Sequence, residues 1–189
     1  MIRLFSILTV LLVISSTFSF GQAKELFTNK DIPNVELKDL KGKKINVQEY
    51  GKNNKVTILN FWATWCGPCI ASFPGMQKAV EKYKDDPSVE ILFVDTWENG
   101  EKDEKIQKVS KFIEKKGYTF HVVMDLDDKV VASYGVRGIP TKFVIGPDGR
   151  VKFKKIGGGA ADKLVDELYT MIDLVKEEAE LDNALSRLD

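Results

Sequence analysis

Short apolar runs bounded by turn residues recur along the chain and predict strands. The runs at 56–61 and 89–94 are almost uninterrupted, as strands buried on both faces require. Pro147-Asp148-Gly149 joins two further runs and is a strong hairpin signal. The expected strands therefore lie at 35–37 and 45–47, which form a hairpin with a glycine turn, and at 56–61, 89–94, 118–123, 141–145 and 151–156.

Other segments repeat their apolar residues with the helical period. The first such segment contains Ile70, Phe73, Met76, Val80 and Tyr83, and Pro74 inside it is expected to kink the helix rather than end it. A second helix around 106–113 stops at Gly117, and a last one covers 164–175. Because strands and helices alternate and a hairpin plus a helix closes the chain, we expect an α/β fold with a mixed central sheet and helices on both faces.

Composition limits the classes of partner. The 189 residues include 28 Lys and Arg and 28 Asp and Glu, so the formal net charge is zero. A balanced charge gives no electrostatic case for nucleic acid or for an anionic membrane, and we expect no nucleic-acid partner. The chain has only two cysteines, and both belong to one motif, so the fold must rest on its hydrophobic core.

The N-terminus has the three parts of a secretory signal peptide. Arg3 precedes the apolar run 4–14, and small residues follow at Gly21-Gln22-Ala23. We expect cleavage after Ala23, with Gly21 as the second choice, and the alternative is a retained membrane anchor at 4–20. In either case the protein is expected to be exported and periplasmic. The expected division is a signal peptide at 1–23, one domain at 24–175 and a charged helical extension at 176–189.

The two cysteines, Cys66 and Cys69, stand directly after the buried run 56–61 in the sequence Cys-Gly-Pro-Cys. A strand that turns sharply into a helix would place Cys66 at the helix N-terminus, where unpaired N–H groups and the helix dipole favour a thiolate. Thiols in such positions have pKa values of roughly 3.5 to 7.5, against about 8.5 for a free thiol. Cys69 would lie one turn further on, close enough to form a disulfide. The leading hypothesis is a redox-active dithiol.

Three other uses of the dithiol are weighed against this hypothesis. A zinc site lacks ligands, because the chain has no third cysteine and a single histidine, His121. A structural disulfide closing so short a loop would stabilise the fold little. A copper-handling or assembly protein is the main alternative, because two thiolates suffice for a soft ion such as Cu(I). We expect no cofactor.

The sequence resembles thioredoxin at two motifs in the right order, Phe61-Trp62-Ala63-Thr64-Trp65-Cys66-Gly67-Pro68-Cys69 and Tyr134-Gly135-Val136-Arg137-Gly138-Ile139-Pro140-Thr141. With its signal sequence, N-terminal hairpin and inserted helix-strand unit, it is similar to the exported TlpA/ResA-like branch. The resemblance implies a thioredoxin fold and thiol-disulfide exchange. Gly67-Pro68 matches the reducing type of thioredoxin, so we expect the protein to reduce disulfides in exported proteins. An upstream electron donor would then reduce the protein again. A peroxidase of the peroxiredoxin type is disfavoured by the Cys-Gly-Pro-Cys motif.

The resemblance also assigns roles to single residues. It implies that Cys66 is the attacking nucleophile, Cys69 the resolving thiol, and Pro140 a cis-proline beside them. Ile139 would offer its backbone to an extended partner segment. Trp65, Gly67 and Pro68 would form the rest of the binding surface, Trp62 would be the buried aromatic beneath the cysteines, and the loop 157–159 would pass near them.

The chain departs from the family at two positions. The buried aspartate of thioredoxin is replaced by Asn60, and the glutamate that many TlpA/ResA-like proteins carry is replaced by Ser72. An acid near Cys69 would help to remove its proton during resolution. The sequence assigns that role to no residue, and it gives Trp97 no role.

Overall fold

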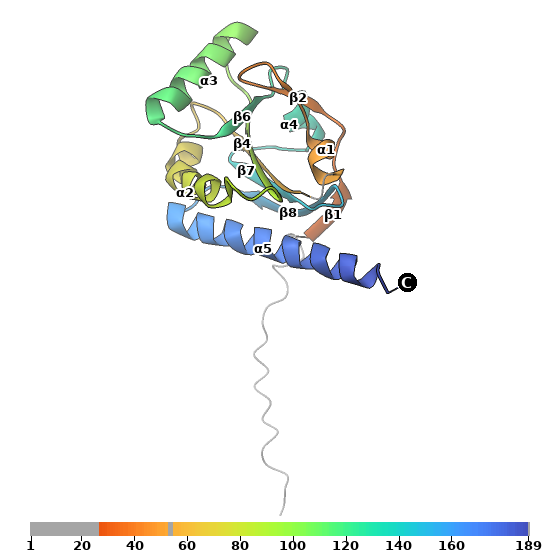
Figure 1. The fold of residues 1–189 in the computed structure, drawn as a ribbon. Coiled ribbons are helices and arrows are strands. Elements are labelled where there is room, and N and C mark those ends of the chain that lie inside the picture. The colour runs from red at the N-terminus through yellow and green to blue at the C-terminus, as the bar shows by residue number, and fades with distance from the viewer. Residues whose placement is uncertain (1–26, 53–54, 189) are drawn as a thin grey trace, which may run out of the picture.

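The computed structural model describes residues 27–52 and 55–188 (Figure 1). The expected signal peptide lies outside the described residues. Within the described ranges, none of the helices combines the length and the apolar character that crossing a membrane requires.

The centre of the fold is a mixed sheet with the strand order β1-β8-β7-β4-β5-β6-β2-β3. Strands β4, β5 and β6 run parallel to one another, and the other pairs are antiparallel. The strands are β1 (Phe27–Asp31), β2 (Glu36–Asp39), β3 (Lys44–Asn46), β4 (Val56–Trp62), β5 (Val89–Asp95), β6 (His121–Met124), β7 (Thr141–Ile145) and β8 (Arg150–Ile156).

Helices cover both faces of this sheet (Figure 1). The helices are α1 (Val47–Lys52), α2 (Gly67–Tyr83), α3 (Lys102–Lys116), α4 (Lys129–Ser133) and α5 (Ala161–Leu185). Apolar residues of α2, α3 and α5 form one core with the first sheet face, and residues of α1 and α4 form a second core with the other face. The α/β class, the mixed sheet and the thioredoxin topology expected from the sequence are confirmed.

Strand β4 lies between β7 and β5, and every residue of it is buried. Both faces therefore carry core residues, with Ile58 and Trp62 in the first core and Leu59 and Phe61 in the second. Burial on both faces is what its uninterrupted apolar sequence predicts. The strand ends at Trp62, shortly before Cys66, so a fully buried central strand leads directly into the site.

Helix α2 packs against the start of α5 through a glycine. A Cβ atom on Gly75 would collide with the carbonyl oxygen of Ala161, so only glycine allows this approach of the two backbones. Pro74 lies inside α2 without ending it, as expected. Helix α5 extends beyond the body of the sheet at its C-terminal end (Figure 1), and Lys176 and Glu178 bond to Asp86 and Lys152.

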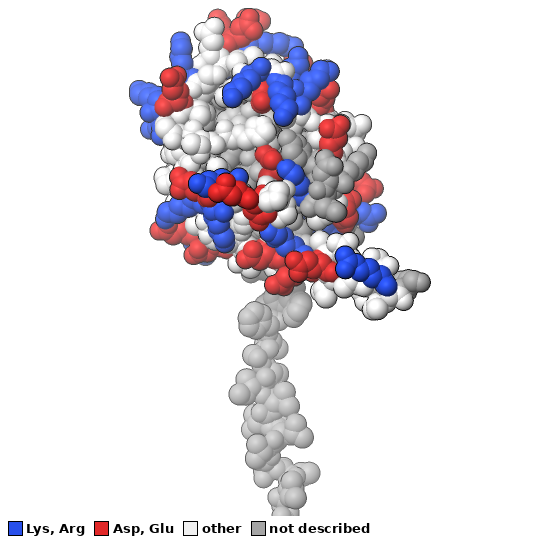
Figure 2. All heavy atoms as spheres, in the orientation of Figure 1, with Lys and Arg blue, Asp and Glu red and all other residues white. Residues whose placement is uncertain are grey.

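Most of the expected elements are confirmed, and five differ. Strand β6 begins only at His121, whereas α5 continues to Leu185 through most of the helical extension expected at 176–189. The helices α1 and α4 and the edge strand β1 were not expected. On the face seen in Figure 2, charged side chains of both signs are interspersed over the described surface.

Candidate active site

Cys66 and Cys69 form a disulfide at the N-terminus of α2. Cys66 is the N-cap residue, and its Sγ accepts a hydrogen bond of 3.2 Å from the backbone N–H of Cys69. The first turn of α2 has no acidic residue, so no negative charge opposes the positive end of the helix dipole there. A thiolate formed at Cys66 on reduction would be stabilised by both effects.

The two sulfurs differ in access. Cys66 is 3% exposed and Cys69 is fully buried, while Gly67 and Pro68 between them are exposed. A partner sulfur can therefore approach Cys66. Cys69 cannot meet the partner directly and can react only with the sulfur of Cys66.

A second loop lies against this turn. The Ile139–Pro140 peptide bond is cis. The position of a Cβ on Gly158 would lie 3.1 Å from the carbonyl oxygen of Pro68 and 3.7 Å from Cγ of Pro140. The N–H of Gly157 donates to the carbonyl oxygen of Pro140 over 2.8 Å. The structure thus brings the loop 157–159 and Pro140 beside the cysteine turn, as expected.

A third loop, 96–98, follows β5 and was not foreseen as part of the site. The indole N–H of Trp65 donates to the carbonyl oxygen of Trp97 over 3.0 Å. Trp97 has a φ of 56°, a left-handed conformation that is uncommon for a bulky residue, and its N–H is held by the Asp128 carboxylate at 3.1 Å. Trp65 remains 53% exposed, so the bond fixes its ring without covering it.

Glu98 connects the same loop to the residue before Trp65. Its buried carboxylate accepts the backbone N–H of Thr64 and pairs with Lys108 of α3. The nearby carboxyl of Asp95 is also buried, and burial, together with the charge of Glu98, raises its pKa to about 9. The only sequence signal for these contacts is a polar segment directly after a buried parallel strand, where α/β proteins place functional residues.

The polar residues beneath the disulfide are buried. Asn60 and Ser72 have no exposed surface, and the Ser72 hydroxyl donates to the carbonyl oxygen of Cys69 over 2.6 Å. Neither amide atom of the Asn60 side chain has a hydrogen-bond partner among the described residues. Trp62 is fully buried beside Phe73, which makes it the inner aromatic that the sequence predicts.

No group of three or more metal-ligating side chains is found in the part of the chain that the structure describes. His121, the single histidine of the sequence, bonds to Glu90 over 2.8 Å and is a satisfied strand residue. A disulfide in this position can accept two electrons and two protons, and the dithiol can return them.

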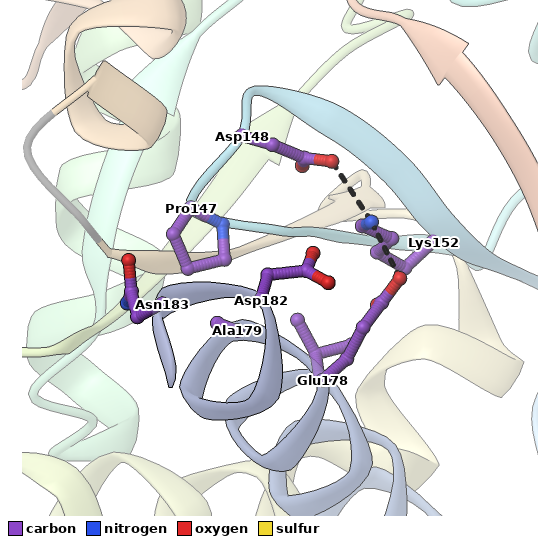
Figure 3. A pocket seen from close by; sticks show the side chains of 8 residues that line it. Pro147, Asp148, Lys152, Glu178, Ala179, Asp182 and Asn183 are labelled. Atoms are coloured by element: carbon purple, nitrogen blue, oxygen red, sulfur yellow. Dashed lines mark hydrogen bonds and ion pairs between the residues drawn. The ribbon is translucent and has the colours of Figure 1, made fainter. Parts of the chain in front are cut away.

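Another pocket, of about 230 Å³, lies between the β7–β8 turn and the end of α5 (Figure 3). Lys152 points into it and bonds to both Asp148 and Glu178, at 2.8 and 2.9 Å. Strand β7 runs from Thr141, near the disulfide, to Ile145, near this turn, so the pocket belongs to the opposite end of the strands. Its charged groups satisfy one another and hold α5 to the sheet.

A thioredoxin-fold domain with a disulfide at the N-terminus of α2 and a cis-proline beside it defines the class of thiol-disulfide oxidoreductases. The sequence model of the AhpC/TSA family matches residues 28–154. The chain belongs to this family of thioredoxin-like proteins and is, within it, similar to ResA thiol-disulfide oxidoreductases.

The relatives cover almost the whole chain. ResA of Bacillus anthracis is 34% identical over 86% of this chain and 92% of its own length. ResA of Bacillus subtilis is 33% identical over 90% and 93%. Among solved structures, StoA from Bacillus subtilis matches with a TM-score of 0.57 and 28% identity, over 71% of this chain and 95% of its own. A Chlorobium tepidum protein described as the thiol:disulfide interchange protein DsbE matches with a TM-score of 0.64 and 30% identity, over 78% and 99%. This chain is an oxidoreductase of the same kind.

Proposed function

We propose that this oxidoreductase reduces disulfides in exported proteins. The observation that carries the proposal is the difference between its two sulfurs. Cys66 caps a helix and keeps a trace of exposure, whereas Cys69 is buried one turn further on. That arrangement suits a nucleophile that meets the partner and a second thiol that releases it.

The reaction has two steps. The Cys66 thiolate attacks one sulfur of the partner disulfide, a mixed disulfide forms, and the other partner sulfur leaves as a thiolate that takes up a proton. Cys69 then loses its proton and attacks Sγ of Cys66, which forms the Cys66–Cys69 disulfide and expels the second partner thiol. The partner gains two electrons and the oxidoreductase loses two, so an upstream dithiol donor must reduce it again.

The oxidoreductase would bind the partner through the partner's backbone. Ile139 directly precedes Pro140 in the chain, and an extended segment of the partner would add to its backbone as a strand. Trp65 and Ile156, which are 53% and 66% exposed, provide apolar surface for such a segment. Recognition of this kind accepts many partner sequences.

Export is proposed from residues 1–23, which have the composition of a signal peptide. Fractionation of cells that express the full chain, followed by N-terminal sequencing, tests this. A mature N-terminus at Lys24 or Gln22 in the extracytoplasmic fraction is expected. Recovery of the uncleaved chain in the membrane fraction would instead support the anchor.

The reductase reaction is tested with insulin as a disulfide substrate. The reduced wild-type domain is expected to reduce insulin, and Cys66→Ser is expected to abolish the reaction because the nucleophile is lost. Cys69→Ser should trap the mixed disulfide, which identifies natural partners by mass spectrometry of an extract. Insulin reduction that survives in Cys66→Ser would contradict the assignment. Stoichiometric Cu(I) binding that blocks alkylation of both thiols, in a protein inactive on insulin, would favour the soft-metal alternative.

A further inference from the structure

Lys142 is a buried lysine in the middle of β7, and no part of the proposed reaction uses it. Only 2% of its surface is exposed. Its Nζ has no hydrogen-bond partner among residues 27–52 and 55–188. Lysine is almost never fully buried without a partner, because an unpaired ammonium loses its hydration. A position that keeps it so calls for an explanation.

Lys142 lies on the sheet face that packs against the helix carrying Cys69. It is the register partner of Asn60 on the β4–β7 ladder. Val144 and Ile58, two residues away on their respective strands, belong to the core that α2 and α5 cover, and Cys69 belongs to the same core. Since side chains alternate along a strand, Lys142 and Asn60 face the helix that carries Cys69.

This face is the one where the family's acids are missing. Asn60 stands in place of the thioredoxin aspartate, and Ser72 donates to the carbonyl oxygen of Cys69. A neutral amide and a hydroxyl do not accept a proton near neutral pH. Of these three buried polar side chains, only Lys142 can do so, through its amine.

The charged groups around Lys142 come from two other elements. Lys155, its register partner on β8, bonds to Glu167 of α5 over 2.9 Å. Burial, and after it the charge of Lys155, lower the pKa of Lys142 to about 8, while the charge of Glu167 acts in the opposite direction. The residues that α5 buries are all apolar. The titratable groups that α2 buries are Cys69 and Tyr83, and Tyr83 lies at the far end of that helix.

The pKa of this amine is close to that of a thiol. A cysteine has a pKa of about 8.5 when free, so a proton can move from Cys69 to an amine of pKa about 8 with little free-energy change. At a pKa of about 8, roughly a tenth of the amine is neutral at pH 7 and about half at pH 8, whereas an unperturbed lysine, at about 10.4, would be almost entirely protonated at both pH values.

We propose that Lys142 takes up the proton that leaves Cys69 when the mixed disulfide is resolved, in place of the missing acid. The S–H bond of Cys69 breaks and an N–H bond forms on the amine. The Cys69 thiolate then forms the bond to Cys66 as the partner thiolate leaves, and the ammonium returns its proton to solvent. The inference rests on the proposed function, in which Cys69 is the resolving thiol.

The first test measures the ionisation of Cys69 directly. In Cys66→Ser protein, the rate of Cys69 alkylation is followed against pH, with and without Lys142→Met. The Lys142→Met change is expected to raise the pKa of Cys69 by about one pH unit, which lowers the thiolate fraction at neutral pH about tenfold. Lys154→Met, on the opposite face of β8, is the matched control and should leave the pKa unchanged.

The second test follows the reaction itself. Stopped-flow release of a chromogenic thiol from the Cys66 mixed disulfide is measured from about pH 5 to about pH 10. The wild-type rate should show an apparent pKa that also appears in the NMR titration of the Lys142 side chain, because the two groups titrate as a pair. Lys142→Met should remove that ionisation. The NMR titration needs no variant, so it remains informative if a variant folds poorly.

Two outcomes overturn the inference. One is an unchanged Cys69 pKa and rate profile in Lys142→Met. The other is that the rate profile shifts in Asp95→Asn, which removes the carboxyl of raised pKa on β5, but does not shift in Lys142→Met. Both leave the proposed function intact, because that function is tested separately by insulin reduction in the wild type and in Cys66→Ser.

Discussion

Replacing Lys142 by Met is expected to make the protein more stable at neutral pH. Burial lowers the pKa of this lysine from 10.5 to about 8, so the folded state binds the proton more weakly than the unfolded chain does. At about 1.4 kcal/mol per pH unit, this difference destabilises the folded protein by roughly 3 kcal/mol below pH 8. Met removes that penalty and occupies a similar volume.

The stabilising effect of Lys142→Met is expected to depend on pH. Between about 8 and 10.5 the unfolded chain binds more protons than the folded protein, so the stability of the wild type rises with pH in this window. The advantage of Lys142→Met should therefore be largest at pH 7 and shrink above 10.5, where the lysine is neutral in both states.

The assay is urea unfolding of the disulfide form at pH 7 and at a pH above 10.5. Equal m-values in wild type and variant would show that only the free energy of unfolding has changed. At pH 7 the gain of roughly 3 kcal/mol corresponds to a rise in Tm of about 6–12 °C. Lys154 is only half-buried, so Lys154→Met should change stability by a smaller amount that is equal at both pH values. A loss of stability in Lys142→Met, or a gain of equal size at both pH values, would refute the reasoning.

The other predictions concern the contacts around the site. Glu98→Ala should destabilise the protein by about 1–3 kcal/mol in urea unfolding, because the N–H of Thr64 loses its buried acceptor, whereas Glu98→Gln should retain most of that stability. Gly75→Ala should cost about 1–3 kcal/mol through collision with Ala161, whereas Gly67→Ala, whose Cβ meets nothing within 4 Å, should not. The raised pKa of Asp95 makes stability fall as pH rises from about 4 to about 9, and Asp95→Asn should flatten that slope in unfolding measured across this window.

The parts of the fold that were predicted correctly are those whose signals are local. Burial on both faces makes β4 an uninterrupted apolar run, and the β7–β8 turn carries its own Pro-Asp-Gly sequence. The two cysteines, Pro140 and the loop 157–159 were expected together because the motifs that carry them resemble one family. Where a segment's own residues determine its structure, the sequence was sufficient.

Of the missed features, helices α1 and α4 are too short to show a helical period, and the others depend on segments far apart in the chain. Helix α4 has only five residues, and its N-terminal N–H groups at Val130 and Val131 are satisfied by the carboxylate of Asp125. The bond from Trp65 to Trp97 joins residues 32 positions apart. Lys142 lies between Thr141 and Phe143 in the sequence, and lysine is seldom buried, but β4, β8 and the two helices above the sheet bury it. No local pattern records these contacts.

Each of the hydrogen bonds described around the disulfide has a main-chain group on at least one side. The N–H of Cys69 binds Sγ of Cys66, and the N–H of Gly157 binds the carbonyl oxygen of Pro140. The carbonyl oxygen of Trp97 accepts from the indole of Trp65. A main-chain group is present whatever the side chain, so substitutions at positions other than Cys66 and Trp65 leave these bonds available. Divergence can therefore go far before the geometry of the site is lost, which fits a chain that shares about one third of its residues with relatives matching nearly its full length. The surface around the cysteines is correspondingly free to change its partners during evolution while the sulfur chemistry stays the same.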